Sequence, residues 1–178
     1  MTGALVIGVG SPLMGDDGLG LAALEALRKG WTFDPALELM DGGTWGMNLL
    51  PFIESSSRVL ILDAIRAGRE PGDFVRLEGD QIPRYFATKL SPHQIDLKEV
   101  LALAELRGTF PEHTIVAGLE PAVIEMSVSL SDQVRAGLPG LVRHVLDQLA
   151  IWGFRATPTG DAELDSLNWS AFNIEGRH

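Results

Sequence analysis

The sequence predicts a three-layer α/β fold, in which a mostly parallel, twisted sheet carries helices on both faces. Two observations lead to this prediction. Short apolar, β-branched segments alternate along the chain with longer segments whose apolar residues recur at helical spacing. Because parallel strands are joined by right-handed crossovers, this alternation places helices on both sides of a single sheet.

The predicted strands are short and apolar, as strands that are buried on both faces of a sheet usually are. Residues 5–9 end in a glycine-rich turn, and residues 58–65 contain the run Val-Leu-Ile-Leu, which makes them the clearest strand. Further strands are predicted at residues 37–40, 73–77 (antiparallel, at an edge), 113–118 and 125–129.

The predicted helices cover residues 18–29, 45–54, 94–107 and 131–151. Asp16 is expected to cap the first of them at its N-terminus, and Gly30 to be its C′ residue. Ser131 is a suitable N-cap for the last. Gly46 and Pro51 weaken the second helix, since both disfavour a helix interior.

The length fits one domain of ordinary size. A chain of 178 residues and 19.2 kDa can bury a real core but is too short for two ordinary enzyme domains. We assign residues 1–155 to one α/β domain and residues 156–178 to a C-terminal tail. Residues 174–178 (IEGRH) are typical of a protease-cleavable linker leading into an affinity tag, so they are left out of the fold.

The composition excludes several classes of function. The net charge is 14 − 24 = −10, which disfavours binding to nucleic acid. The absence of cysteine rules out disulfides, thiol nucleophiles and cysteine zinc sites. No Lys or Arg precedes Arg28, and no apolar run approaches the roughly 18 residues of a membrane span. We therefore expect a soluble, cytoplasmic protein with no nucleic-acid or membrane partner.

Candidate ligands follow the predicted strands, where α/β sheets bind their substrates. Asp17 follows the first strand, Asp63 follows residues 59–62, and His93 precedes the helix at 94–107. The topology can bring these three residues to one rim of the sheet. Two carboxylates and one imidazole form a three-ligand set that leaves coordination positions open for a substrate. Such a set suits Ni, Zn, Mn or Fe and does not choose among them.

Each of these residues also has a structural interpretation. Asp17 falls in the first turn of a helix, where the macrodipole alone favours a carboxylate. His93 could be an ordinary residue at a helix N-terminus. Asp63 is harder to explain in this way, because burying a carboxylate at the end of an apolar strand is costly.

Two other site types are not supported. The segment Gly8-Val9-Gly10 begins like a dinucleotide-binding turn, but Leu13 stands where the third glycine is required. No nucleotide cofactor is therefore expected. A Ser-His-Asp triad is also disfavoured, since the chain has no Gly-x-Ser-x-Gly elbow.

Four motifs, in order and over roughly the first 150 residues, resemble those of the nickel–iron hydrogenase maturation endopeptidases. They are residues 8–20 (GVGSPLMGDDGLG), 41–47 (DGGTWGM), Asp63-Ala64 and residues 91–94 (SPHQ). The family usually has Asn at the position of Ser11, a difference that concerns a hydrogen bond of the first loop and not the metal site.

The resemblance implies an endopeptidase that removes the C-terminal extension of the hydrogenase large-subunit precursor once nickel is installed there. By analogy, Asp17, Asp63 and His93 contact nickel and carry the catalysis, with the metal arriving on the substrate. The implied enzyme is a metal-dependent peptide hydrolase that relies on aspartates. Either the metal polarises the scissile carbonyl or activates water, or one carboxylate is a general base and the metal a recognition tag.

The same resemblance places substrate recognition in a second loop. Asp41, Gly42, Gly43 and Thr44 are assigned to it, because a loop with two glycines can approach a peptide backbone closely. Trp45 and Phe52 could grip the precursor or belong to the core. The alternative function is a non-catalytic metal-sensing or assembly chaperone that binds the same precursor without shortening it.

Overall fold

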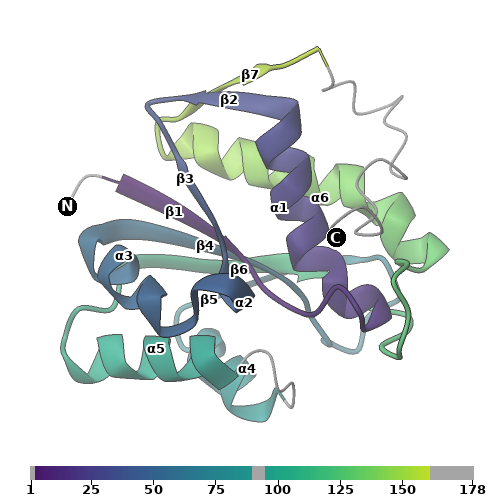
Figure 1. The fold of residues 1–178 in the computed structure, drawn as a ribbon, viewed down its shortest axis with the longest axis horizontal. Coiled ribbons are helices and arrows are strands. Elements are labelled where there is room, and N and C mark those ends of the chain that lie inside the picture. The colour runs from purple at the N-terminus through teal and green to yellow at the C-terminus, as the bar shows by residue number, and fades with distance from the viewer. Residues whose placement is uncertain (1–2, 90–94, 161–178) are drawn as a thin grey trace.

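A five-stranded sheet forms the centre of the computed structural model, which describes residues 3–89 and 95–160 (Figure 1). The strand order is β3-β1-β4-β6-β5, with all neighbours parallel except β5, which pairs antiparallel to β6 at one edge. These strands are β1 (Gly3–Gly8), β3 (Glu38–Asp41), β4 (Ser56–Ala64), β5 (Phe74–Glu78) and β6 (His113–Leu119). The predicted mostly parallel sheet, including its antiparallel edge strand, is confirmed.

Helices cover both faces of this sheet, which confirms the three layers (Figure 1). The first face is covered by α1 (Leu19–Gly30) and α6 (Asp132–Ile151). The second is covered by α3 (Leu50–Ser55), α4 (Gln81–Thr88) and α5 (Ile95–Leu106). Among the described residues, no helix is long and apolar enough to span a membrane.

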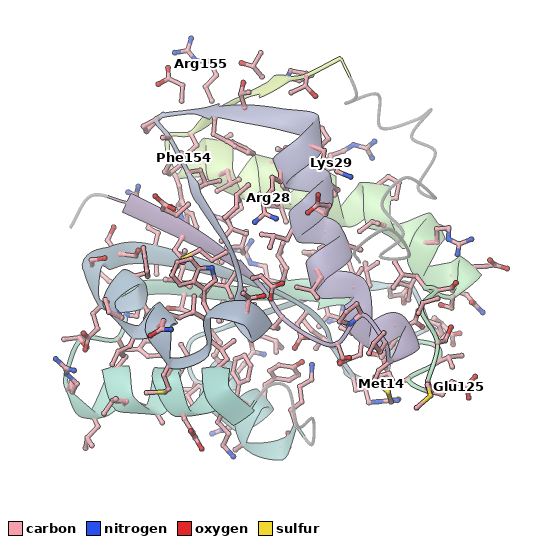
Figure 2. The ribbon with its side chains drawn as sticks, viewed as in Figure 1. Met14, Arg28, Lys29, Glu125, Phe154 and Arg155 are labelled. Atoms are coloured by element: carbon pink, nitrogen blue, oxygen red, sulfur yellow. The ribbon has the colours of Figure 1, made fainter. Side chains whose placement is uncertain are left out.

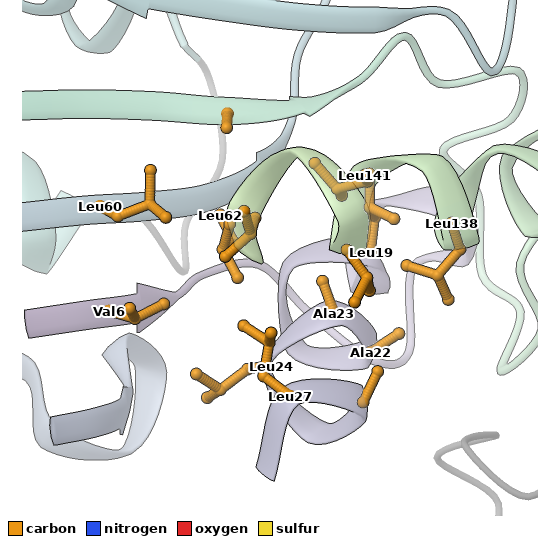
Figure 3. Close-up of a cluster of buried hydrophobic side chains, with 14 of the residues drawn as sticks. Val6, Leu19, Ala22, Ala23, Leu24, Leu27, Leu60, Leu62, Leu138 and Leu141 are labelled. Atoms are coloured by element: carbon orange, nitrogen blue, oxygen red, sulfur yellow. The ribbon is translucent and has the colours of Figure 1, made fainter. Parts of the chain in front are cut away.

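The strands are apolar because both of their faces are buried. In β1, Val6 points toward α1 and α6, while its neighbours Leu5 and Ile7 point to the opposite core. Leu60 and Leu62 of β4 lie in the same core as Val6. Figure 3 shows these strand residues together with leucines and alanines of α1 and leucines of α6. Its helix side chains include Leu19, Leu24, Leu27, Leu138 and Leu141.

The close packing of α1 on the sheet depends on Gly20. A Cβ at this position would lie 2.2 Å from the carbonyl oxygen of Leu62 and 2.3 Å from that of Val9. We expect Gly20→Ala to lower the free energy of unfolding by about 2 kcal/mol or more, because backbone atoms cannot move aside as a side chain can. Gly140→Ala is the matched control, since a Cβ at that helical position meets nothing within 4 Å. Urea unfolding should show Gly140→Ala unchanged or stabilised by about 0.5–1 kcal/mol; equal losses in both variants would contradict the packing argument.

The start and end of α1 differ from the predicted caps. A short 3-10 helix, η1 (Gly15–Gly18), precedes α1, and Gly18 occupies the N-cap position without a side-chain hydrogen bond. The prediction that Asp16 caps α1 is therefore wrong, because its carboxylate binds a distant loop instead. Gly30 is the last helical residue, and the extended Trp31 follows as the C-cap, so the predicted C′ role of Gly30 is also wrong.

Other elements depart from the prediction as well. The second helix is broken into α2 (Gly42–Trp45), η2 (Gly46–Leu49) and α3, with Gly46 at a φ of +51° between the first two. Residues 125–129 are not a strand, because only the bridge between Met14 and Ser127 forms there. The helix α4 was not predicted.

A two-stranded antiparallel ribbon lies beside the main sheet. It joins β2 (Trp31–Asp34) to β7 (Arg155–Pro158). Neither strand was predicted, and β7 carries regular structure past the expected boundary at residue 155. Residues 161–178, which make up most of the predicted tail, lie outside the described residues.

Candidate functional site

The carboxyl ends of the parallel strands meet at one edge of the sheet, where the first predicted ligands lie. Gly8 at the end of β1 pairs with Asp41 on one side and with Leu62 on the other. Asp63 pairs with Gly118 of β6. Because η1 follows β1 after a short turn, Asp17 enters this edge beside the end of β4.

Asp17 is buried, and its two carboxylate oxygens differ. Oδ2 accepts a hydrogen bond of 2.8 Å from the backbone N–H of Ser11. Oδ1 is buried and has no hydrogen-bond partner within the described ranges 3–89 and 95–160. A buried polar atom without a partner costs free energy, so such atoms are rare in folded proteins and frequently mark functional sites.

Asp63 is the penultimate residue of β4 and is fully buried. Its Oδ2 accepts a hydrogen bond of 2.6 Å from the Tyr85 hydroxyl and forms an ion pair with Lys89. The Lys89 ammonium also donates to the Ala64 carbonyl at 3.0 Å and to the Tyr85 hydroxyl oxygen at 2.7 Å. These contacts anchor the C-terminal end of α4 to the end of β4.

The electrostatics of the edge couple the two carboxylates. Burial raises the pKa of Asp63 above its ordinary value, and the Lys89 ammonium opposes this rise. The negative charge of Asp17 raises the pKa of Asp63 further. Burial also raises the pKa of Tyr85, as does the adjacent Asp63 carboxylate, so the phenol stays a hydrogen-bond donor. The two carboxylates therefore interact electrostatically at the end of β4.

The loop that presents Asp17 is closed by Ser11. Its hydroxyl accepts a hydrogen bond of 3.3 Å from the backbone N–H of Leu13. A serine oxygen thus supplies a hydrogen bond within the loop at the position where the resemblance led us to expect an asparagine.

Asp16 lies next to Asp17 but has a different role. Its fully buried carboxylate accepts hydrogen bonds from the backbone N–H groups of Ala122 (2.8 Å), Val123 (2.9 Å) and Ser131 (2.7 Å). The Ser131 hydroxyl adds a fourth at 2.9 Å. Asp16 thereby holds the loop that follows β6 against η1.

The predicted recognition loop forms a helical turn. Asp41 Oδ1 caps α2 by accepting from the backbone N–H groups of Gly43 (2.9 Å) and Thr44 (3.1 Å). Gly42 is buried, and a Cβ there would lie 2.7 Å from Val9 Cγ1 and 3.0 Å from Ile7 Cγ2, so this glycine packs against the end of β1. Trp45 is exposed and meets Phe52 edge-on, whereas Phe52 packs partly buried against the core.

His93, the third predicted ligand, lies outside the described residues, together with the rest of the segment 90–94. Within the residues that the structure does describe, no three His, Asp or Glu side chains are grouped so that they could hold a metal ion. The structure thus brings together two of the predicted ligands, Asp17 and Asp63.

Tyr85 and Lys89 are site residues that were not predicted from the sequence. They are four residues apart, and Lys89 is the only Lys or Arg between Arg84 and Lys98. An isolated cation just before the segment 91–94 was the available signal. Without α4 in the predicted fold, nothing in the sequence places this cation beside Asp63.

Comparison with known proteins supports one family. The hydrogenase maturation protease family matches residues 21–148. The hydrogenase 2 maturation protease of Escherichia coli is 34% identical over 155 residues, which are 86% of this chain and 94% of that protein. The hydrogenase expression/formation protein HupD of Thiocapsa roseopersicina is 35% identical over 164 residues, which are 91% of this chain and 74% of that protein. The structure of the hydrogenase maturating endopeptidase HybD from E. coli superposes with a TM-score of 0.82 at 33% identity, covering 89% of this chain and 99% of that one.

Proposed function

Because this chain belongs to the hydrogenase maturation protease family, we propose that it removes the C-terminal extension from the precursor of a hydrogenase large subunit. It is an endopeptidase of hydrogenase maturation. The nickel that gates the reaction belongs to the substrate, since the precursor is cut after nickel has been installed in it. No nucleotide cofactor takes part.

One observation supports this assignment most strongly. A buried carboxylate oxygen, Oδ1 of Asp17, lacks a partner within the described part of the chain and lies near the second buried carboxylate, Asp63. A ligand that offers a cation or a proton donor would relieve the cost of that oxygen. A metal-loaded precursor offers a cation, and the water that hydrolyses a peptide offers a proton donor.

The roles of the residues follow from their chemistry. Asp17, Asp63 and His93 supply carboxylate oxygens and an imidazole nitrogen, which are suitable contacts for nickel in the precursor. Nickel held there would polarise the scissile carbonyl or serve as a recognition tag. The backbone N–H of Ser11 orients Asp17, while Tyr85 and Lys89 orient Asp63.

Hydrolysis needs a base that accepts a proton from water, in addition to the residues that position the scissile bond. Water adds to the scissile carbonyl carbon, the C–N bond breaks, and the departing amine takes up a proton. In the alternative in which nickel is only a recognition tag, Oδ1 of Asp17 is the atom best suited to accept the proton of the water, because Oδ2 is already engaged by Ser11. The turn Asp41–Thr44 at the same edge is assigned to contacts with the precursor backbone.

Mass spectrometry of the precursor tests this function. We expect the wild-type chain to shorten a nickel-loaded large-subunit precursor to a single new C-terminus and to leave the nickel-free precursor at full length. A precursor that is bound but keeps its full mass after nickel loading would instead identify a non-catalytic chaperone. Shortening without nickel would show that the metal does not gate the cleavage.

A further inference from the structure

Exposed apolar side chains gather on two segments next to the proposed active site. Leu13, in the turn before η1, is 60% exposed, and Met126, in the loop after β6, is 89% exposed. Val123 and Val128 of the same loop are also exposed. We call these four side chains the apolar rim.

The two segments of the apolar rim are joined by backbone hydrogen bonds. The Ser127 N–H donates to the Leu13 carbonyl at 3.0 Å, and the Ser127 carbonyl accepts from the Gly15 N–H at 2.8 Å. Figure 2 shows Met14 and Glu125, one from each segment, side by side at one end of the molecule. Gly15 permits this approach, with a φ of +60° and no Cβ, which would lie 2.9 Å from the carbonyl oxygen of Val123.

A buried charge holds the loop in place. Asp16 uses its whole carboxylate to accept four hydrogen bonds from Ala122, Val123 and Ser131 at the two ends of the loop. A buried carboxylate is costly unless it is saturated in this way. The apolar side chains are therefore displayed on a backbone that is fixed before any partner binds, which lowers the entropic cost of binding.

The position of this surface identifies its occupant. Leu13 is two residues from Ser11, whose N–H binds the Asp17 carboxylate. A polypeptide whose scissile bond reaches Asp17 therefore lies close to the apolar rim, which begins at Leu13 and continues through the backbone hydrogen bonds to Ser127. Exposed apolar clusters on soluble domains mark interaction sites, and here the neighbouring active site requires a protein substrate.

We propose that Leu13, Val123, Met126 and Val128 form a docking surface for an apolar segment of the precursor that flanks its cleavage site. This inference rests on the proposed function. Docking involves only the protein part of the precursor and does not require nickel. The surface therefore contributes to affinity for the substrate, whereas the carboxylates contribute to the chemical step.

Met126→Glu tests this proposal, with Leu106→Glu as the matched control. Leu106 is 84% exposed at the end of α5, which precedes β6 and so lies toward the amino ends of the strands, away from the apolar rim. Both substitutions put the same charge at a highly exposed site, so neither disturbs the core. We expect Met126→Glu to raise the Kd for the nickel-free precursor about tenfold, because it removes the burial of one large apolar side chain. Leu106→Glu should bind like the wild type, and Met126→Leu should retain the affinity.

The readouts separate this proposal from the proposed function. Binding to the nickel-free precursor is measured without turnover, whereas cleavage of the nickel-loaded precursor is followed by mass spectrometry. A Kd for Met126→Glu equal to that of the wild type would overturn the docking surface even if cleavage occurs. A weaker Kd without cleavage by the wild type would support docking and reject the protease. If Met126→Glu instead dissociated a wild-type dimer, with precursor binding unchanged, the surface would belong to a second copy of the chain.

Discussion

Asp17→Asn is expected to lower the rate of precursor processing by at least about 100-fold while the chain stays folded. An asparagine side chain keeps one carbonyl oxygen, which can still accept the hydrogen bond from the Ser11 N–H. Its amide nitrogen replaces the buried oxygen that lacks a partner within the described residues. The variant therefore removes the negative charge and the proton acceptor but keeps the loop.

The neighbouring Asp16→Asn is the control that separates chemistry from folding. Both oxygens of Asp16 accept hydrogen bonds, so an amide nitrogen there faces at least one N–H or O–H donor. We expect this change to cost about 2 kcal/mol of stability. Thermal unfolding should thus be shifted in Asp16→Asn and nearly unchanged in Asp17→Asn. Wild-type processing rates in Asp17→Asn would exclude Asp17 from both the chemistry and the metal contact.

The contrast between these two aspartates shows what sequence can and cannot predict. A short polar side chain just before a helix suggests an N-cap, and for Ser131 this local reasoning holds, because its hydroxyl accepts a hydrogen bond from the Val134 N–H three residues later. The partners of Asp16 lie more than 100 residues away in the chain, at Ala122, Val123 and Ser131. No local pattern encodes a contact of that range.

The same distinction separates the predicted from the missed elements of the fold. The strands β1, β4 and β6 were predictable because burial on both faces leaves a continuous apolar signal. The ribbon of β2 and β7 has partly exposed strands of four residues that pair across more than 120 positions. Pro83 lies in the first turn of α4, where proline is tolerated, but a proline in the sequence disfavours a helix and so obscures the pattern of α4.

At the site, sequence identified the carboxylates but not the group that neutralises one of them. Asp17 and Asp63 were predicted because each follows an apolar strand, and parallel strands end at a common edge. Lys89 reaches Asp63 only because α4 packs beneath the sheet through Ile82 and Phe86. Such a contact depends on tertiary packing, which a linear pattern does not reveal.

Lys89→Met is expected to lower the free energy of unfolding by about 3 kcal/mol, because it leaves Asp63 without the ammonium that offsets its burial. The pair is well shielded, since the Lys89 side chain is 13% exposed and that of Asp63 is fully buried. Asp63 can respond by taking up a proton, which limits the cost. Adding Asp63→Asn removes the charge itself, so the double variant should be destabilised by less than the sum of the two single variants.

An exposed ion pair provides the comparison for the buried pair of Lys89 and Asp63. Arg155 and Asp34 are 3.0 Å apart in the β2–β7 ribbon, and both side chains are more than three-quarters exposed. Solvent screens such a pair, so Arg155→Met should change the stability by less than about 1 kcal/mol. Urea unfolding of all four variants measures both effects. Additive losses at Lys89 and Asp63 would mean that burial alone, and not the ion pair, determines the stability of this edge of the sheet, and Lys89 would then have no part in orienting Asp63.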